Sequence, residues 1–271
     1  MSISPDSCPS NRLGKNSLKS KLQSQGFVVG TFLEIPSPPL VELLGLAGFD
    51  FVVIDREHGS IDLRDTEELI RASLSTQVCP MVRVPNCEAV VISQTLDMGA
   101  AGVHVPHITS VEMAEVAVHA SKYFPMGRRG LQPYVRAASY RAYDTHEYLA
   151  SVDGDTVIVA QVEGEQALTE LSGIVAVEGV DVAFIGPYDL SQSLGIPGQV
   201  KHARVQNAMA EAIRNACKVG KSIGTYCDDV ETAIEYRNLG ISYLTVSIDA
   251  HIFLSGARSL VSGLKASVAQ K

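Results

Sequence analysis

Residues 51–59 read FVVIDREHG, a short apolar run that stops at a cluster of carboxylates and an imidazole. Seven further runs share this short, apolar character and are rich in β-branched residues. They cover residues 28–35, 79–85, 102–108, 156–163, 180–186, 222–227 and 243–249. None alternates cleanly between apolar and polar residues, which is typical of strands buried on both faces of a parallel sheet.

Segments with apolar residues at helical spacing separate these runs. They lie at about residues 38–47, 62–75, 88–98, 110–122, 165–173, 202–219, 229–239 and 251–264. Strands and helices in strict alternation predict an α/β fold, a closed parallel (β/α)₈ TIM barrel. The alternative is a doubly wound open sheet, which is disfavoured because no G-x-G-x-x-G follows the first run. The long connection 124–155 is expected to be functional, as loops of this length often are.

Composition narrows the possible partners. The chain has 271 residues, a formal net charge of −8 and scattered Lys and Arg, so nucleic acid is an unexpected partner. Five cysteines without a CxxC pair favour reduced thiols in a cytoplasmic protein over a disulfide framework. The absence of a long apolar stretch predicts no membrane span.

We expect residues 1–24 to form a flexible N-terminal tail and residues 25–271 to form a single barrel domain.

The active site of such a barrel lies at the carboxyl ends of its strands. Polar residues follow the predicted strands at that point. They include 55–59 (DREHG), 161–164 (QVEG), 186–189 (GPYD), 227–229 (CDD), His107 and Asp249, with Arg83 inside the third run. Core packing does not explain why successive apolar runs stop at a carboxylate or an imidazole.

Two of these carboxylates suggest a metal site. Glu163 and Asp189 lie one β/α unit apart, so they should stand at the mouths of neighbouring strands. Adjacent carboxylates repel each other unless a cation lies between them, and oxygen ligands suit a hard ion such as Mg²⁺ or Mn²⁺. The alternative is that each acid caps the helix that follows it.

Three further residues are candidates for catalysis or binding. Arg83 in a buried strand should meet an anion, either a substrate oxygen or a structural partner among Asp55, Glu57 and Glu163. His58 beside Asp55 and Glu57 could form an acid–base unit, and the alternative is a solvated loop histidine. His107 could bind substrate or be a satisfied core histidine.

Several segments together resemble a known family. They are GFDFVVIDREHGSID, VRVPN, LDMGAAGVHVPHI, YFPMGRRG, QVEGEQAL and FIGPYDLSQSLGIPGQ, which lie between residues 48 and 199. In this order they resemble the class II pyruvate aldolases, the family of 4-hydroxy-2-oxoheptanedioate and 2-dehydro-3-deoxyglucarate aldolases. Its fold is the barrel of the phosphoenolpyruvate/pyruvate-domain type, and the resemblance covers about residues 26–260.

The resemblance implies roles for the candidate residues. Glu163 and Asp189 would hold a divalent metal, expected to be Mg²⁺, Mn²⁺ or Co²⁺. Arg83 would stabilise the enolate of pyruvate, and Gln161 would support the keto acid. His58, assisted by Asp55, would be the acid–base element.

Backbone amides in the segment formed by Gly186, Pro187 and Tyr188 would hold the substrate carboxylate, and His107 is assigned to substrate binding. Tyr188 departs from the usual Ala of the family, so the acceptor pocket should differ. The resemblance further implies a homo-oligomer, a hexamer built from paired barrels that exchange their last helix.

The expected activity is a carbon–carbon lyase, a metal-dependent aldolase that cleaves or forms a 4-hydroxy-2-oxo acid through a pyruvate enolate. Its partners would be a small keto acid and an aldehyde. No Lys lies in any predicted strand, which argues against a Schiff-base mechanism. The alternative within the family is an oxaloacetate decarboxylase or an enzyme that traps the enolate in a new carbon–carbon bond. Further alternatives are a non-catalytic ligand-binding barrel and a citrate-lyase-type enzyme using Arg128 and Arg129 to bind phosphate.

Overall fold

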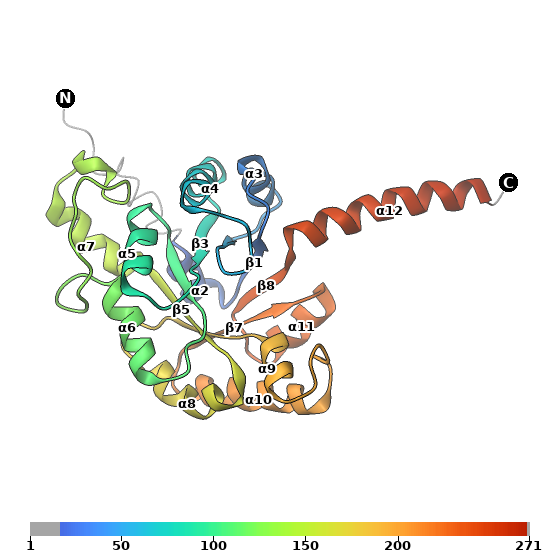
Figure 1. The fold of residues 1–271 in the computed structure, drawn as a ribbon. Coiled ribbons are helices and arrows are strands. Elements are labelled where there is room, and N and C mark those ends of the chain that lie inside the picture. The colour runs from blue at the N-terminus through green and yellow to red at the C-terminus, as the bar shows by residue number, and fades with distance from the viewer. Residues whose placement is uncertain (1–16, 270–271) are drawn as a thin grey trace.

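Eight parallel strands close into a barrel in the computed structural model, which describes residues 17–269 (Figure 1). Neighbours in the sequence are neighbours in the barrel, and β1 pairs with β8 to close it. The strands are β1 Val28–Leu33, β2 Phe51–Asp55, β3 Cys79–Arg83, β4 Gly102–Val105, β5 Val157–Val162, β6 Val182–Ile185, β7 Ser222–Cys227 and β8 Tyr243–Ile248. The predicted (β/α)₈ barrel and its eight strands are therefore confirmed.

Helices surround the barrel and cover its outer face (Figure 1). They are α3 Pro38–Leu46, α4 Leu63–Thr76, α5 Ala89–Asp97, α6 Val111–Ser121, α7 Thr145–Asp155, α8 Gly164–Ala176, α9 Pro187–Ser193, α10 Ala203–Lys218, α11 Val230–Asn238 and α12 Asp249–Ala269. Asp62 caps α4 and Ser110 caps α6, because each side chain accepts a hydrogen bond from a first-turn backbone N–H. Helices α7 and α9 were not predicted. Helix α9 has seven residues and begins at a proline, so it offers little periodic signal.

The N-terminal boundary differs from the expectation of a flexible tail over residues 1–24. Helix α2, Leu18–Gln25, begins inside that range and is capped by Ser17. Leu18 is buried and packs with the apolar residues of the barrel interior, such as Val28 and Phe51. Burial of this leucine explains why the helix is held against the barrel rather than left free. Residues 1–16 of the expected tail lie outside the described residues.

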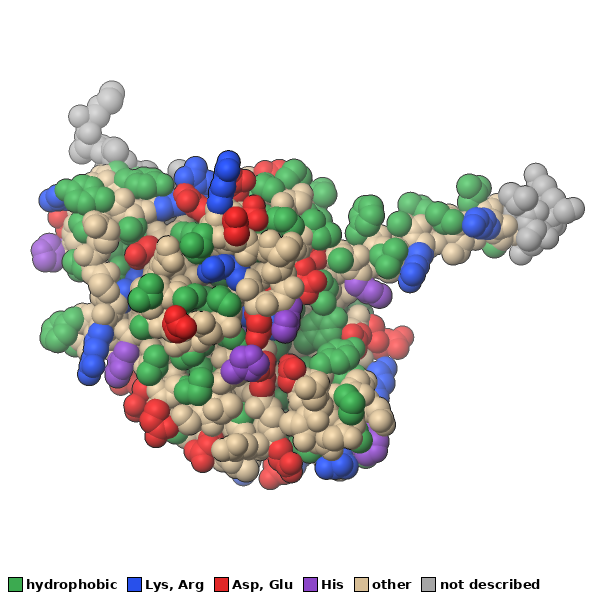
Figure 2. Space-filling model, in the orientation of Figure 1, with side chains coloured by type: hydrophobic (Ala, Val, Ile, Leu, Met, Phe, Trp, Pro, Cys, Tyr) green, Lys and Arg blue, Asp and Glu red, His purple; other side chains and the backbone are tan. Residues whose placement is uncertain are grey.

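The C-terminal helix α12 extends away from the barrel (Figure 1). Large apolar side chains along it are exposed, and Figure 2 shows them spread over the projecting helix. They include Phe253, which is 74% exposed, Leu260, which is 78% exposed, and Leu264, which is 70% exposed. Among the described residues, no helix is both long enough and apolar enough to cross a membrane.

Candidate active site

Side chains that face into the barrel alternate along each strand, as in other closed barrels. Along β5 they are Val157 and Val159, which belong to the interior cluster, followed by the buried Gln161. Glu163 continues the same series just past the end of the strand. Along β2 the series ends at Asp55. The functional side chains are therefore the last, polar members of the inward-facing rows.

Arg83 is the last residue of β3 and lies beside Asp55 in the strand register. Its Nε and Nη2 donate to the two oxygens of Asp55 at 2.9 and 2.6 Å, and its Nη1 lies 3.1 Å from a Glu57 oxygen. Asp55 is 0% exposed, so this two-point pair replaces the water that the carboxylate has lost. Of the partners considered for Arg83, the structure selects Asp55 and Glu57.

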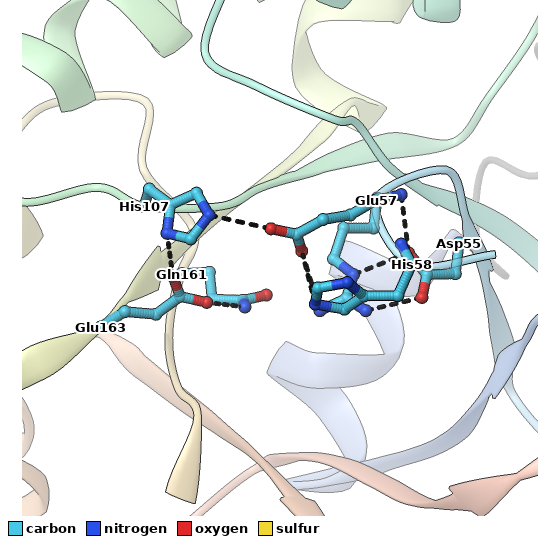
Figure 3. Close-up of polar contacts among 7 residues, drawn as sticks. Asp55, Glu57, His58, His107, Gln161 and Glu163 are labelled. Atoms are coloured by element: carbon cyan, nitrogen blue, oxygen red, sulfur yellow. Dashed lines mark hydrogen bonds and ion pairs between the residues drawn. The ribbon is translucent and has the colours of Figure 1, made fainter. Parts of the chain in front are cut away.

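His58 lies at the mouth of the barrel, where its side chain is 68% exposed. Its Nε2 is 3.9 Å from a Glu57 oxygen, and its backbone N–H donates to Asp55 at 3.4 Å. The Asp55 carboxylate therefore holds the backbone of the segment that carries His58 (Figure 3). The sequence did not decide whether Asp55 or Glu57 lies beside the His58 imidazole, and in the structure Glu57 is the nearer carboxylate.

His107 bridges two carboxylates across the mouth (Figure 3). Its Nε2 lies 3.0 Å from a Glu57 oxygen, and its Nδ1 contacts Glu163. The residue lies past the end of β4 with a φ of 56°, a left-handed conformation that side chains other than glycine seldom adopt. His107 is thus not a core histidine, although it faces the carboxylates rather than the main cavity of the mouth.

Glu163 and Asp189 are the two residues expected to hold a metal. Burial raises the pKa of the Glu163 carboxyl, and the charge of Asp189 raises it further, while Gln161 and His107 act in the opposite direction. Gln161 also contacts Glu163 through its amide nitrogen. No three His, Cys, Asp or Glu side chains of residues 17–269 form a ready-made metal cluster. A carboxylate whose pKa is raised by burial and by a second carboxylate beside it fits a hard divalent cation whose other ligands come from water and substrate.

A cavity of 370 Å³ opens at the mouth between these strands. Its lining includes the predicted residues His58, Arg83, Gln161, Gly186, Pro187, Tyr188 and Asp189. Glu34, Tyr226 and Ile248 line it as well, and sequence reasoning did not select them. The period-two row in the first predicted strand, residues 28, 30, 32 and 34, was the signal that could have found Glu34.

His104 lies directly beneath this site, inside the barrel. It is 0% exposed and packs edge-on to Phe184, with ring centroids 4.5 Å apart. Burial lowers the pKa of the imidazole well below 6.5, and the neighbouring Arg83 charge lowers it further. The folded protein therefore holds His104 neutral, whereas the unfolded chain protonates it below its ordinary pKa of about 6.5.

We expect His104 to make stability depend on pH. Because its folded pKa is the lower one, the unfolded state takes up the extra proton, and stability is lost as pH falls below about 6.5. The loss is up to about 1.4 kcal/mol per pH unit. Urea unfolding at pH 7.5 and 5.5 should show a smaller loss for His104→Leu than for the unmodified protein. The exposed His146→Gln serves as control, and an equal loss in all three proteins would contradict the prediction.

The part of the chain that is similar to known proteins is nearly the same as the part that forms the barrel. The sequence profile of the HpcH/HpaI aldolase/citrate lyase family matches residues 29–256. The chain belongs to this family. A hydroxypyruvate/pyruvate aldolase from Cupriavidus necator is 34% identical over 250 residues, which cover 92% of this chain and 93% of that protein. A 5-keto-4-deoxy-D-glucarate aldolase from Escherichia coli is 32% identical over 255 residues, which cover 94% and 99% of the two chains.

The HpcH/HpaI fold is also seen in solved structures. A family protein from Burkholderia cenocepacia superimposes with a TM-score of 0.87 at 32% identity and covers 92% of this chain and 98% of that one. The predicted resemblance to the class II pyruvate aldolases and the predicted lyase class are therefore confirmed. The chain is therefore a class II aldolase, a carbon–carbon lyase, of the HpcH/HpaI family.

Proposed function

We propose that this aldolase forms or cleaves a 4-hydroxy-2-oxo acid through the enolate of pyruvate, with Mg²⁺, Mn²⁺ or Co²⁺ as cofactor. The observation that carries the proposal is that Arg83, Gln161 and Asp189 line one cavity at the carboxyl ends of the strands. Glu163 contacts Gln161 and lies close enough to Asp189 for that charge to raise its pKa. The resemblance to the class II pyruvate aldolases also implies a divalent metal at these residues.

The residues present fit a metal ion. Glu163 and Asp189 offer oxygen ligands. Burial, and then the charge of Asp189, raise the pKa of the Glu163 carboxyl. A cation between the two carboxylates would therefore reduce both their repulsion and the cost of burying their charge. When bound, the cation would act as a Lewis acid toward the oxygens of the keto acid. Each acid lies where a helix begins, yet neither α8 nor α9 shows a side-chain capping hydrogen bond. Helix capping therefore does not account for the pair.

Arg83 would face the charge that develops on the keto-acid fragment. Cleavage leaves an electron pair on that fragment as an enolate, and a guanidinium fixed in advance by Asp55 and Glu57 needs no reorganisation to stabilise it. Gln161 is 2% exposed, and its amide contacts Glu163, so it is held rigidly beside the same oxygens. Tyr188 and Asp189 lie in the first turn of α9, where backbone N–H groups lack helical partners and can bind a carboxylate.

His58 would move the proton between the acceptor oxygen and solvent. It lines the cavity, is largely exposed and lies near Glu57, which suits a group that exchanges protons with water. Asp55 assists by holding the backbone of residues 57 and 58. No lysine lines the cavity among the described residues, which supports metal–enolate chemistry over a Schiff base.

We also propose that the aldolase is a homo-oligomer. The exposed apolar side chains of α12 support this, since such a helix is costly in water and a second copy of the chain could cover it. Exchange of this helix between paired barrels agrees with the arrangement expected from the family resemblance.

Proton exchange tests the proposed function. Pyruvate incubated with the protein and Mg²⁺, Mn²⁺ or Co²⁺ in D₂O should lose its methyl proton signal in NMR without any added aldehyde. Exchange reports the enolate whatever the true acceptor is. Protein stripped by a chelator should be inactive and recover on metal addition. Equal exchange rates with and without metal would refute the mechanism. Oxaloacetate tested in parallel should release CO₂ if the decarboxylase alternative holds.

A further inference from the structure

One wall of the mouth cavity has no part in the chemistry described above. The enolate machinery occupies the ends of β3, β5 and β6, and His58 follows β2. The opposite wall comes from β7, β8 and β1, which contribute Tyr226, Ile248 and Glu34. His58, the residue proposed to move the proton of the acceptor oxygen, lines the same cavity, so we expect the acceptor aldehyde to contact this wall.

Glu34 is fixed in position at the end of β1. The carboxylate of the buried Asp249 accepts hydrogen bonds from the backbone N–H groups of Glu34 at 3.2 Å and Ile35 at 2.9 Å. This anchoring leaves the Glu34 side chain half-buried along the cavity. Burial raises the pKa of the Glu34 carboxyl, and Asp55 and Asp249 raise it further, whereas Arg83 and His58 lower it.

No lysine or arginine of the described residues forms an ion pair with Glu34. Arg83 is the one Lys or Arg among the described residues that line the cavity, and its guanidinium is already engaged by Asp55 and Glu57. A second carboxylate stands at the rim, where Asp228 accepts the hydroxyl hydrogen of Tyr188 at 2.9 and 3.0 Å. Since that hydrogen is committed to Asp228, the Tyr188 oxygen offers only lone pairs to a ligand.

We propose that Glu34 on this wall, together with the hydroxyl oxygen of Tyr188 on α9, selects a neutral, hydroxylated aldehyde as acceptor and disfavours an aldehyde that carries a carboxylate. Glu34 and the Tyr188 oxygen accept hydrogen bonds, so they match hydroxyl groups and repel an anion. The inference rests on the proposed function. In the step concerned, the methyl carbon of pyruvate loses a proton and bonds to the aldehyde carbon, whose oxygen gains a proton. No oxidant or reductant is needed.

Two small aldehydes provide a matched test. Glycolaldehyde and glyoxylate differ by a hydroxymethyl group in place of a carboxylate. The ratio of their kcat/KM values, measured with pyruvate and Mg²⁺ at pH 8, should fall about tenfold in Glu34→Gln relative to the unmodified enzyme, which is the size of one charge interaction at a partly solvated mouth. Comparing ratios cancels the different intrinsic reactivities of the two aldehydes. Glu42→Gln removes the same charge from the exposed face of α3 and should leave the ratio unchanged.

Salt provides a second measurement that needs no variant. Discrimination against glyoxylate by the unmodified enzyme should weaken between about 0.02 and 0.5 M ionic strength, because screening shortens the reach of the Glu34 charge. An unchanged ratio in Glu34→Gln together with salt-independent discrimination would overturn the inference. If pyruvate exchange in D₂O proceeds normally in that case, the proposed function stands. If the unmodified enzyme shows no exchange at all, the proposed function itself fails.

Discussion

Glu163→Gln should reduce metal-dependent exchange of the pyruvate methyl protons by about a thousandfold. The substitution removes one of two anionic ligands, and a loss of about 4 kcal/mol of stabilisation at the developing enolate corresponds to that factor. The amide keeps the size of the side chain and can still accept the contact from Gln161, so the fold should persist. NMR in D₂O measures the rate, and calorimetry with Mn²⁺ should show weaker binding.

Glu165→Gln is the matched control for that experiment. Glu165 lies two residues further on, in the first turn of α8, and its side chain is exposed. The Glu165→Gln variant loses the same charge at a position away from the cavity, so exchange of the pyruvate methyl protons and Mn²⁺ binding should stay near the values of the unmodified protein. If Glu163→Gln exchanged as fast as this control, Glu163 could not be a metal ligand in the reaction.

Arg83→Ala should have the largest combined effect on activity and stability. Asp55 is fully buried, and removal of the guanidinium leaves its charge without a partner, which costs about 3–5 kcal/mol of unfolding free energy. Exchange of pyruvate protons should fall about a hundredfold or more, as when a preorganised donor to a developing oxyanion is lost. Metal affinity should change much less, because Arg83 is not a ligand. Urea unfolding, D₂O exchange and Mn²⁺ calorimetry separate the three effects.

Second substitutions distinguish electrostatics from general damage. Asp55→Asn combined with Arg83→Ala should recover part of the lost stability, since the unpaired charge is gone. Arg83→Lys keeps the charge but not the two-point geometry, and it should regain only part of the exchange rate. Arg71→Ala, which breaks an exposed pair with Glu67 on α4, should alter neither property appreciably. Full stability in Arg83→Ala would show that the pair with Asp55 is not buried as described.

Much of the site could be predicted because it continues the strands. Each apolar run ends where the inward-facing row turns polar, so Asp55, Arg83, Gln161 and Glu163 stood out by position alone. Glu34 escaped the same logic. It is followed by the apolar Ile35, which extended the predicted strand past the end of β1 at Leu33 and hid the carboxylate inside the run.

Other features had no local signal. His107 was assigned to substrate binding, with a core histidine as the alternative, and the sequence did not show that a left-handed backbone turns it toward Glu57 and Glu163. Helix α2 was assigned to a tail because its sequence is polar. Burial of Leu18 against the barrel and the ion pairs of Lys19 with Asp181 and of Lys21 with Asp50 hold it in place. In both cases the deciding contact is with residues far away in the chain.

The sequence by itself determined the barrel and the end of it that carries the chemistry. Both follow from local periodicity, because strand and helix patterns repeat eight times and parallel strands share one carboxyl end. Only the tertiary structure decided that Arg83 pairs with Asp55, that His107 bridges two carboxylates and that Glu34 lines the cavity. These contacts join side chains from different strands and loops, and the register and curvature of the sheet, rather than the spacing of the residues in the sequence, set the distances between them.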